Sequence, residues 1–254
     1  MSTSAITLIG GPTVLLEWAG LRIVTDPTFD APQVYPPDPG RAQLEKTQGP
    51  AIARQDLGAV DLVLLSHHQH RDNLDYEGLE LIATGVLTLS TRKASLDLFG
   101  GSVVGLDSWE SYQFGDATIT AVPALHGPPG VESSTGPVIG FVLEAEGEPT
   151  VYVSGDNASV PLVEQIADRF APVALAILFA GAARVPMIDA PLTLTGPDAV
   201  AAARALRAGR VAAVHTDGWK HFSEDRASFD AAFAAAGLSD LVLGLPRGER
   251  VVVE

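Results

Sequence analysis

The six histidines of the chain are the residues whose type and placement point most directly to chemistry. Structural histidines scattered through a core would show no preferred position, whereas catalytic and binding groups commonly lie on loops held by a rigid scaffold. Here every histidine stands at the end of a predicted strand or in the loop that follows it: His67, His68, His70, His126, His215 and His221. This placement predicts that the loops after several strands form one shared site.

The densest group lies in residues 66–75, directly after a predicted buried strand, and contains the spacing His68-x-His70-x-Asp72-Asn73. Alternate side chains of an extended segment point the same way, so His68 and His70 can approach one metal ion. Asp72 can supply an oxygen to the same or a neighbouring ion. The alternative is a solvated polar loop with a helix cap, which three histidines and two aspartates within nine residues argue against.

Three other segments each place a candidate ligand after a predicted strand. His126 ends a strand before a Gly/Pro loop, and Asp156 follows another strand; alone, the first could be a structural histidine and the second a turn aspartate. His215 ends a third strand, and His221 follows in the next loop. Each signal is weak by itself, but their order and placement together indicate a metal centre.

Alternating strand-like and helix-like segments must position these loops. Strands are predicted at residues 5–9, 13–18, 21–25, 60–65, 86–90, 102–106, 111–114, 118–123, 138–144, 150–154, 175–179, 211–215 and 251–253. Helices are predicted at residues 74–82, 92–99, 161–169, 197–208 and 223–236. Residues 27–50, rich in Pro, Gly and Asp, read as a long surface loop that forms a lid or wall of the site.

Length and composition narrow the class of protein. The 254 residues are 46% apolar and 19% charged, which is typical of a globular domain with a sizeable core. A net charge of −15 argues against nucleic-acid partners and anionic membrane surfaces, because both are bound through clustered Lys and Arg. The absence of cysteine excludes disulfides and a cysteine nucleophile and suits the cytoplasm. We see no signal peptide, and the longest apolar run, residues 171–183, is too short to cross a bilayer.

These motifs, in this order, resemble the metallo-β-lactamase superfamily, and within it the L-ascorbate-6-phosphate-lactonase-like branch of metal-dependent hydrolases. The segments at residues 13–17, 20–27 and 218–222 are also similar to that branch, so the resemblance covers nearly the whole chain. It implies an α+β fold, an αββα four-layer sandwich. It also implies one domain, residues 1–254, made of two similar halves.

The resemblance implies a ligand set as well. His68, His70 and His126 would hold one ion, Asp72 and His215 a second, and Asp156 would bridge them. Two departures leave the register open, because Asn73 replaces the last histidine of the family signature and His67 is an additional histidine. The register with His68 and His70 is preferred because it keeps the family spacing; the alternative pairs His67 with His70 across one inserted residue.

Ligands that are all nitrogen or oxygen suit zinc, with manganese or iron as alternatives. Because a neutral amide binds zinc poorly, we expect one tight site and a second site that is weak or empty. A metal-bound hydroxide would then attack a small ester, lactone or related substrate. Asp72 would orient the water and His221 would contact the substrate, while Asp26 would either hold a ligand histidine or serve as a turn residue.

Two other functions remain open from the sequence. One is a non-catalytic binding or regulatory protein with a decayed metal site, of which Asn73 would be the mark. The other is a phosphodiesterase of the same superfamily, which the net charge of −15 disfavours for large polyanionic substrates. We expect a small-molecule substrate in either enzymatic case, and the sequence leaves the oligomeric state open.

Overall fold

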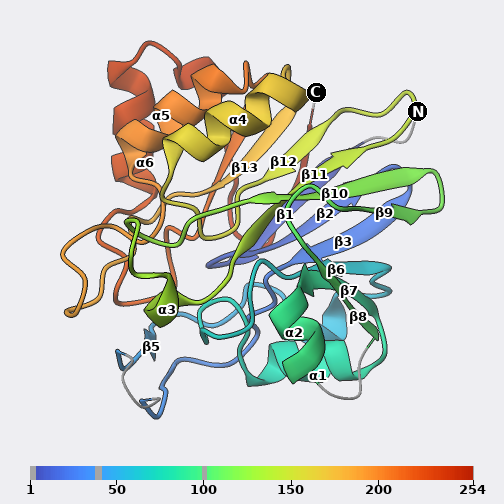
Figure 1. The fold of residues 1–254 in the computed structure, drawn as a ribbon, viewed down its shortest axis with the longest axis vertical. Coiled ribbons are helices and arrows are strands. Elements are labelled where there is room, and N and C mark those ends of the chain that lie inside the picture. The colour runs from blue at the N-terminus through green and yellow to red at the C-terminus, as the bar shows by residue number, and fades with distance from the viewer. Residues whose placement is uncertain (1–3, 38–41, 99–101, 254) are drawn as a thin grey trace.

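The computed structural model describes residues 4–37, 42–98 and 102–253. Two β-sheets pack face to face, and helices cover the outer face of each (Figure 1). This is the α+β four-layer sandwich expected from the sequence. No helix among the described residues is long and apolar enough to span a bilayer.

The first sheet has seven strands in the order β15-β1-β2-β3-β6-β7-β8. Its strands are β1 (Ala5–Gly10), β2 (Thr13–Trp18), β3 (Leu21–Thr25), β6 (Leu62–Leu64), β7 (Leu87–Thr91), β8 (Ser102–Leu106) and β15 (Arg250–Val252). Ala19 and Gly20 join β2 to β3 in a tight hairpin turn. Both have a positive φ, 50° and 75°, which is the conformation that lets a two-residue turn match the twist of the two strands. From β3 to β8 the strands run parallel, so their carboxyl ends share one edge.

The second sheet has six strands in the order β14-β13-β12-β11-β10-β9. Its strands are β9 (Ser111–Phe114), β10 (Ala117–Pro123), β11 (Ile139–Glu144), β12 (Val151–Val153), β13 (Leu175–Phe179) and β14 (Arg210–Val214). β12, β13 and β14 are parallel. A separate two-stranded ribbon, β4 (Gln33–Val34) with β5 (Glu45–Lys46), lies inside the long segment predicted as a loop.

The helices divide between the two outer faces. α4 (Val160–Phe170), α5 (Gly196–Ala205) and α6 (Arg226–Ala235) cover the second sheet, and α1 (Tyr76–Ala83) and α2 (Arg92–Asp97) cover the first (Figure 1). The short helix α3 (Glu132–Thr135) and the single 3₁₀ turns η1 (Arg54–Asp56) and η2 (Ser239–Leu241) lie in connections. Most helices begin at a side-chain cap, such as Ser159 before α4 and the capping box of Thr195 with Asp198 before α5.

Alternation along the strands builds two kinds of core. In β10, Ile119 and Ala121 point between the sheets, whereas Val122 faces the helices of the second sheet. In β6, Leu62 and Leu64 point between the sheets and Val63 packs toward α1. Strands buried on both faces explain the continuous apolar runs of the sequence.

The predicted elements are present, with shifts at their ends that have local causes. The helix expected from residue 74 begins at Tyr76 because Asp75 caps it, accepting from Gly78 N. The helix expected from residue 223 begins at Arg226 because Asp225 caps it in the same way. The expected end of α2 at Phe99 lies outside the described residues.

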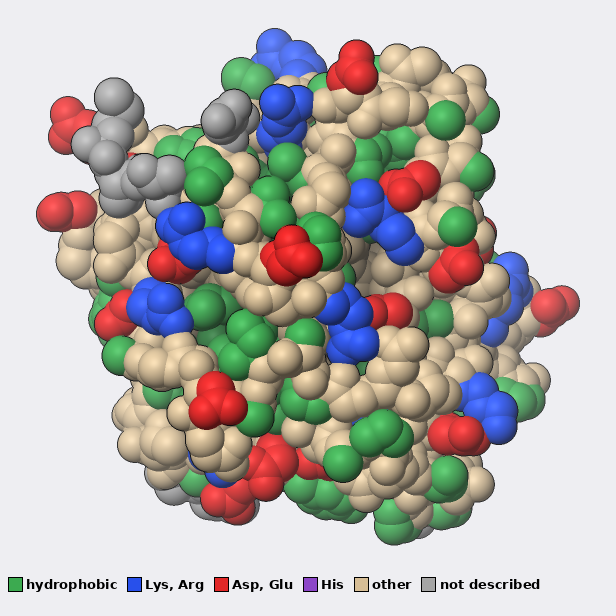
Figure 2. Space-filling model, turned by 180° about the vertical axis from the view of Figure 1, so that it is seen from behind, with side chains coloured by type: hydrophobic (Ala, Val, Ile, Leu, Met, Phe, Trp, Pro, Cys, Tyr) green, Lys and Arg blue, Asp and Glu red, His purple; other side chains and the backbone are tan. Residues whose placement is uncertain are grey.

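One face of the molecule is mixed in charge. Figure 2 shows one face, on which Lys and Arg side chains are interspersed with Asp and Glu instead of gathering into one patch. No histidine of the described residues is visible on this face.

Candidate metal centre

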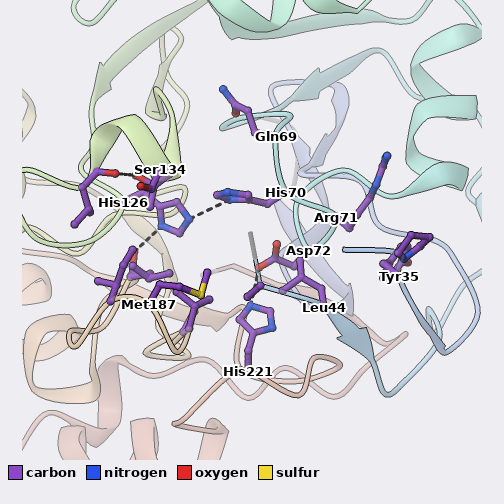
Figure 3. A pocket seen from close by; sticks show the side chains of 18 of the residues that line it. Tyr35, Leu44, Gln69, His70, Arg71, Asp72, His126, Ser134, Met187 and His221 are labelled. Carbon is purple, nitrogen blue, oxygen red and sulfur yellow. Dashed lines mark hydrogen bonds and ion pairs between the residues drawn. The ribbon is translucent and has the colours of Figure 1, made fainter. Parts of the chain in front are cut away.

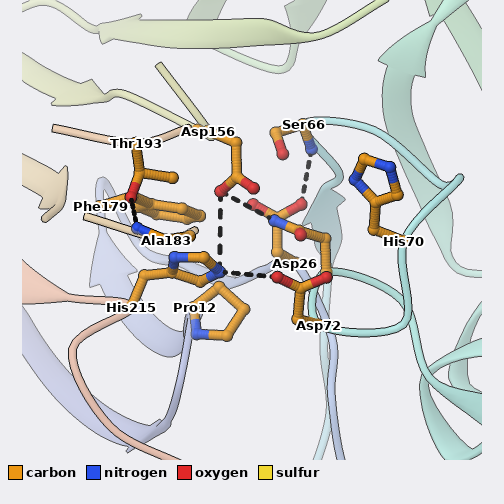
Figure 4. A network of polar contacts seen from close by, with 12 residues as sticks. Pro12, Asp26, Ser66, His70, Asp72, Asp156, Phe179, Ala183, Thr193 and His215 are labelled. Atoms are coloured by element: carbon orange, nitrogen blue, oxygen red, sulfur yellow. Dashed lines mark hydrogen bonds and ion pairs between the residues drawn. The ribbon is translucent and has the colours of Figure 1, made fainter. Parts of the chain in front are cut away.

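The loops that carry the predicted site residues converge in one place (Figure 4). The loop after β6 brings three of these residues, and the loops after β10, β12 and β14 bring one each. The first sheet thus provides His67, His70 and Asp72, and the second provides His126, Asp156 and His215. Convergence at the ends of parallel strands is what the placement of the histidines predicted.

Three imidazole nitrogens form the first cluster. His70 Nδ1 lies 2.9 Å from His67 Nε2 and 3.2 Å from His126 Nε2. A tetrahedral zinc ion with Zn–N bonds of about 2.0–2.1 Å separates its ligand atoms by roughly 3.3 Å. The observed separations therefore match the edges of a coordination shell, and the three histidines fit a transition-metal ion.

The second ring nitrogens of this cluster fix how the rings are turned. His126 Nδ1 donates to Leu192 O at 2.8 Å, and His67 Nδ1 lies 2.9 Å from Ser66 Oγ. Such outer contacts orient a ligand histidine and leave the other nitrogen free for a metal. Burial, followed by the nearby His70 and His126, lowers the pKa of His67 well below its usual value, so this ring is neutral, the form that binds metal.

His68 lies outside this cluster, and the preference for His68 over His67 is therefore corrected. His68 Nε2 is 2.9 Å from Asp97 Oδ2, at the end of α2, on the outside of the loop. The spacing argument assumed an extended backbone, but the loop turns, with Leu74 N bonded to His70 O at 2.9 Å. In the turned loop His67 and His70 face one another, as the alternative register supposed.

Two carboxylates and one imidazole form the second cluster. His215 Nε2 lies 3.5 Å from Asp72 Oδ2 and 3.7 Å from Asp156 Oδ1, and all three side chains are buried. The other oxygen of Asp156, Oδ2, lies 3.5 Å from His126 Nε2 and has no hydrogen-bond partner. The Asp156 carboxylate thus reaches from one cluster to the other, as a bridging ligand would.

The charges in the second cluster are coupled. Burial by itself would raise the pKa of Asp72, but His221 and His215 outweigh it and hold the pKa well below its usual value. Burial would lower the pKa of His215, but Asp156 and then Asp72 outweigh it and raise that pKa. The Asp72 carboxylate is therefore ionised, and a divalent ion would compete with the proton that the raised pKa of His215 favours.

Asp26 supports the start of the histidine loop. Its Oδ1 accepts a 2.7 Å hydrogen bond from the backbone N–H of Ser66, which precedes the first ligand histidine. Burial, followed by Asp156, raises the pKa of Asp26 well above its usual value. Asp26 thus positions the loop through Ser66 N, a role other than the two expected from the sequence, a hold on a ligand histidine or a turn residue.

The backbone is unusual beside two of the candidate ligands. Gly155 has a φ of 56°, and a Cβ there would lie 2.7 Å from both Ile139 O and Ser66 Cβ. His215 also has a positive φ, 57°, and its carbonyl packs so closely on Gly181 that a Cβ on that glycine would be 2.0 Å away. Backbone strain of this kind persists where the surroundings hold a functional side chain in place.

A cavity of about 220 Å³ opens beside the two clusters (Figure 3). His70, Asp72, His126 and His221 reach it from the metal centre. Apolar side chains line much of the rest: Leu44, Val131, Val185, Met187, Ile188 and Leu192. Tyr35 and Leu44 come from the long segment at residues 27–50, which therefore forms a wall of the cavity, as predicted.

A buried ion pair fastens this wall to the scaffold. Lys46 Nζ lies 2.8 Å from Asp75 Oδ2, with side-chain exposures of 3% and 0%, and Asp30 N donates to the same oxygen at 2.7 Å. Tyr35 stacks on Trp219 at a ring distance of 5.5 Å, and Trp219 is buried. Two segments far apart in the sequence are thereby held together next to the site.

Sequence reasoning gave no signal for several of these supporting residues. Leu192 accepts the hydrogen bond of His126 through its backbone carbonyl. Every residue type has this group, so the sequence does not mark the position. Arg71 lines the cavity with its guanidinium 4.4 Å from the centre of the Tyr76 ring, a contact that depends on tertiary packing. A lysine and an aspartate 29 positions apart, Lys46 and Asp75, likewise carry no local pattern.

Lys46→Met should destabilise the fold by about 3–5 kcal/mol near neutral pH, because it leaves the buried Asp75 carboxylate without its partner. Burial already raises the pKa of Asp75 despite Lys46, and loss of the lysine should raise it further. Because the pKa of Asp75 is higher in the folded state than in the unfolded state, this carboxyl favours folding at low pH. That contribution to stability is lost as the pH rises through the folded-state pKa. The defect should therefore be larger at pH 8 than at pH 5 in urea unfolding.

Lys220→Met is the matched control, because Lys220 pairs with Glu45 on the same ribbon but is 69% exposed. It should change the free energy of unfolding little at either pH. Equal losses in the two variants would show that the buried pair does not hold the wall.

The chain is similar in sequence to a family of known proteins. The sequence model described as "Beta-lactamase superfamily domain" matches residues 21–216. The "UPF0173 metal-dependent hydrolase" of Pelotomaculum thermopropionicum is 28% identical over 204 residues, covering 77% of this chain and 84% of that protein. A protein of the same description from Anaeromyxobacter sp. is 28% identical over 172 residues, but only 56% of its length is covered.

Solved structures share the whole architecture. A possible metal-dependent hydrolase from Veillonella parvula has a TM-score of 0.86 at 21% identity, covering 98% of this chain and 99% of that one. An isothiocyanate hydrolase from Delia radicum gut bacteria has a TM-score of 0.84 at 22% identity, covering 97% and 98%. At these identities the likeness concerns the fold.

Proposed function

The chain belongs to the β-lactamase superfamily, and from this premise we propose that it is a metal-dependent hydrolase of small substrates. The observation that carries the proposal is the convergence of His67, His70 and His126 at separations of a metal shell, at the base of a cavity. The relatives described as metal-dependent hydrolases support it.

Zinc is the ion we propose, because the first cluster offers three imidazole nitrogens. A divalent ion bound there would lower the pKa of a water and polarise the oxygen of an electrophile. Asp72 lines the cavity with a carboxylate kept ionised by its neighbours, so it can accept a proton at the substrate. Asp26 and Ser66 hold the loop that aims these groups.

The lining of the cavity favours a small substrate with an apolar part, such as an ester or a lactone. Valine, leucine, isoleucine and methionine side chains form its walls, and Arg71 and Gln69 add polar groups. A solved neighbour of the same fold is an isothiocyanate hydrolase, so this fold accommodates hydrolysis at a small carbon electrophile. The lactonase-like branch, the single domain over residues 1–254 and a cytoplasmic location stay proposals of the same kind.

Catalytic efficiency, kcat/KM, should rise from acetyl to butyryl esters, because each added methylene gains roughly tenfold or more in an apolar pocket. Ile188→Asp should abolish this gain by placing a charge in the wall. Pro186→Asp puts the same charge on an exposed neighbouring position that does not line the cavity, and it should leave the gain intact.

A panel of acyl esters, lactones and phosphodiesters, assayed with zinc-loaded protein, tests the proposal. Hydrolysis of phosphodiesters alone would move the assignment to a phosphodiesterase. Metal binding without turnover of any class would favour the binding or regulatory protein.

A further inference from the structure

We propose that His221 supplies the nitrogen ligand that Asn73 does not, so that the second metal site is completed from the loop after β14. The inference rests on the proposed metal-dependent function, and it replaces the expectation of a second site that is weak for want of a nitrogen ligand. It adds a ligand to the three side chains already gathered there: Asp72, Asp156 and His215.

Asn73 is already engaged as a hydrogen-bond donor. Its Nδ2 donates to Asp156 Oδ1 at 3.2 Å, the oxygen that faces His215. An amide binds a metal through its oxygen, and Asn73 Oδ1 is buried without a hydrogen-bond partner, but this neutral oxygen is a weak ligand for zinc. Asn73 therefore orients the bridging carboxylate and offers the second site at most a weak oxygen ligand, so the nitrogen ligand must come from another residue.

His221 contacts the same carboxylate oxygen of Asp72 as His215 does. Its Nε2 is 2.9 Å from Asp72 Oδ2, and the same oxygen is 3.5 Å from His215 Nε2. The shorter separation equals the shorter one in the first cluster, 2.9 Å, and the longer exceeds its counterpart there, 3.2 Å, by 0.3 Å. His221 reaches the cluster from the cavity side, which it lines together with Asp72 (Figure 3).

The position of His221 is fixed by contacts on both sides. Its carbonyl accepts from Arg184 N at 2.9 Å, and its ring packs edge-on against Phe222 at 4.8 Å. The preceding residue, Lys220, donates its N–H to Glu45 O at 3.1 Å, in the ribbon that forms the cavity wall. The ring is thus held toward Asp72 and is not free to turn into solvent.

The outer contacts of the two clusters differ. Within the described residues, the Nδ1 atoms of His215 and His221 find no hydrogen-bond partner, whereas those of His67 and His126 do. Such partners typically contribute 10–100-fold to metal affinity. The second ion should therefore bind more weakly than the first while still reaching full occupancy at excess metal.

Cobalt(II) titration of the metal-stripped protein tests the inference. The wild type should take up two equivalents in two steps of unequal affinity. His221→Ala should keep the first step and raise the second dissociation constant by more than the roughly 100-fold typical of losing an outer contact. His68→Ala, which alters a histidine of the loop after β6 that lies outside both clusters, should keep both steps.

A cysteine variant reports coordination directly, because the natural chain contains no cysteine. In His221→Cys, the second equivalent of cobalt should produce a thiolate-to-metal charge-transfer band in the near ultraviolet. His68→Cys should give no such band. Thermal unfolding of each variant checks that the fold is retained.

The outcomes separate this inference from the proposed function. Unchanged second-step affinity in His221→Ala, or no band in His221→Cys, overturns the role of His221. A wild type that binds only one equivalent at saturation also overturns it and leaves the three-histidine site standing. A wild type that binds none contradicts the metal-dependent function itself.

Discussion

His67→Ala is expected to lose the tightly bound ion and, with it, essentially all hydrolytic activity, whereas His68→Ala keeps both. His67 Nε2 lies 2.9 Å from His70 Nδ1 in the first cluster, while His68 is engaged with Asp97 on the outside of the loop. A metal held by two imidazoles in place of three loses a direct ligand, so its affinity should fall by more than the roughly 100-fold typical of outer contacts.

Elemental analysis of the two variants after dialysis, beside an activity assay on a short-chain ester, checks this result. His67 and His68 are adjacent in the sequence, so each alanine variant is the control for the other. Loss of the ion in His68→Ala with retention in His67→Ala would restore the register with the family spacing and contradict the geometry of the loop.

Asp156→Asn should reduce the metal content at both clusters at once. The two carboxylate oxygens lie 3.5 Å from His126 Nε2 and 3.7 Å from His215 Nε2, one in each cluster. The substitution keeps the shape but removes the negative charge, and one of its two atoms becomes an N–H donor. A neutral amide cannot bridge two cations, so we expect activity to drop to the background rate.

Asp97→Asn is the matched control, because it makes the same chemical change at the 38%-exposed partner of His68. It should leave metal content and activity close to those of the wild type. If Asp156→Asn retained two ions after dialysis, each cluster would hold its ion without the shared carboxylate.

The sequence predicted the site as far as strand order determines it. The carboxyl ends of parallel strands meet at one edge, so candidates placed after separate strands, such as His126, Asp156 and His215, had to converge. The alternation of apolar residues made the strands predictable, whereas the sandwich was expected from the resemblance to the metallo-β-lactamase superfamily.

The internal geometry of the loop after β6 was not predictable from spacing. The two-residue period holds for extended backbone, but the segment turns at His70, which brings residues three apart into contact. The start of the loop is held by Asp26, which accepts from Ser66 N across 40 positions of the sequence. The carbonyl of Leu192 and the pair Lys46–Asp75 are equally long-range and depend on the assembled tertiary structure.

The six candidate ligands divide equally between the two sheets, and this division gives the ions a mechanical role. An ion shared by His67 and His70 on one side and His126 on the other would be a cross-link between layers that also meet through side-chain packing and a few backbone hydrogen bonds, such as Ile139 N to Ser66 O. The unfolded chain offers no such converging set, so metal binding adds to folding stability, by about 2.7 kcal/mol when free metal is 100 times its dissociation constant. The supply of metal in the cell would then determine how long the protein persists as well as how fast it works.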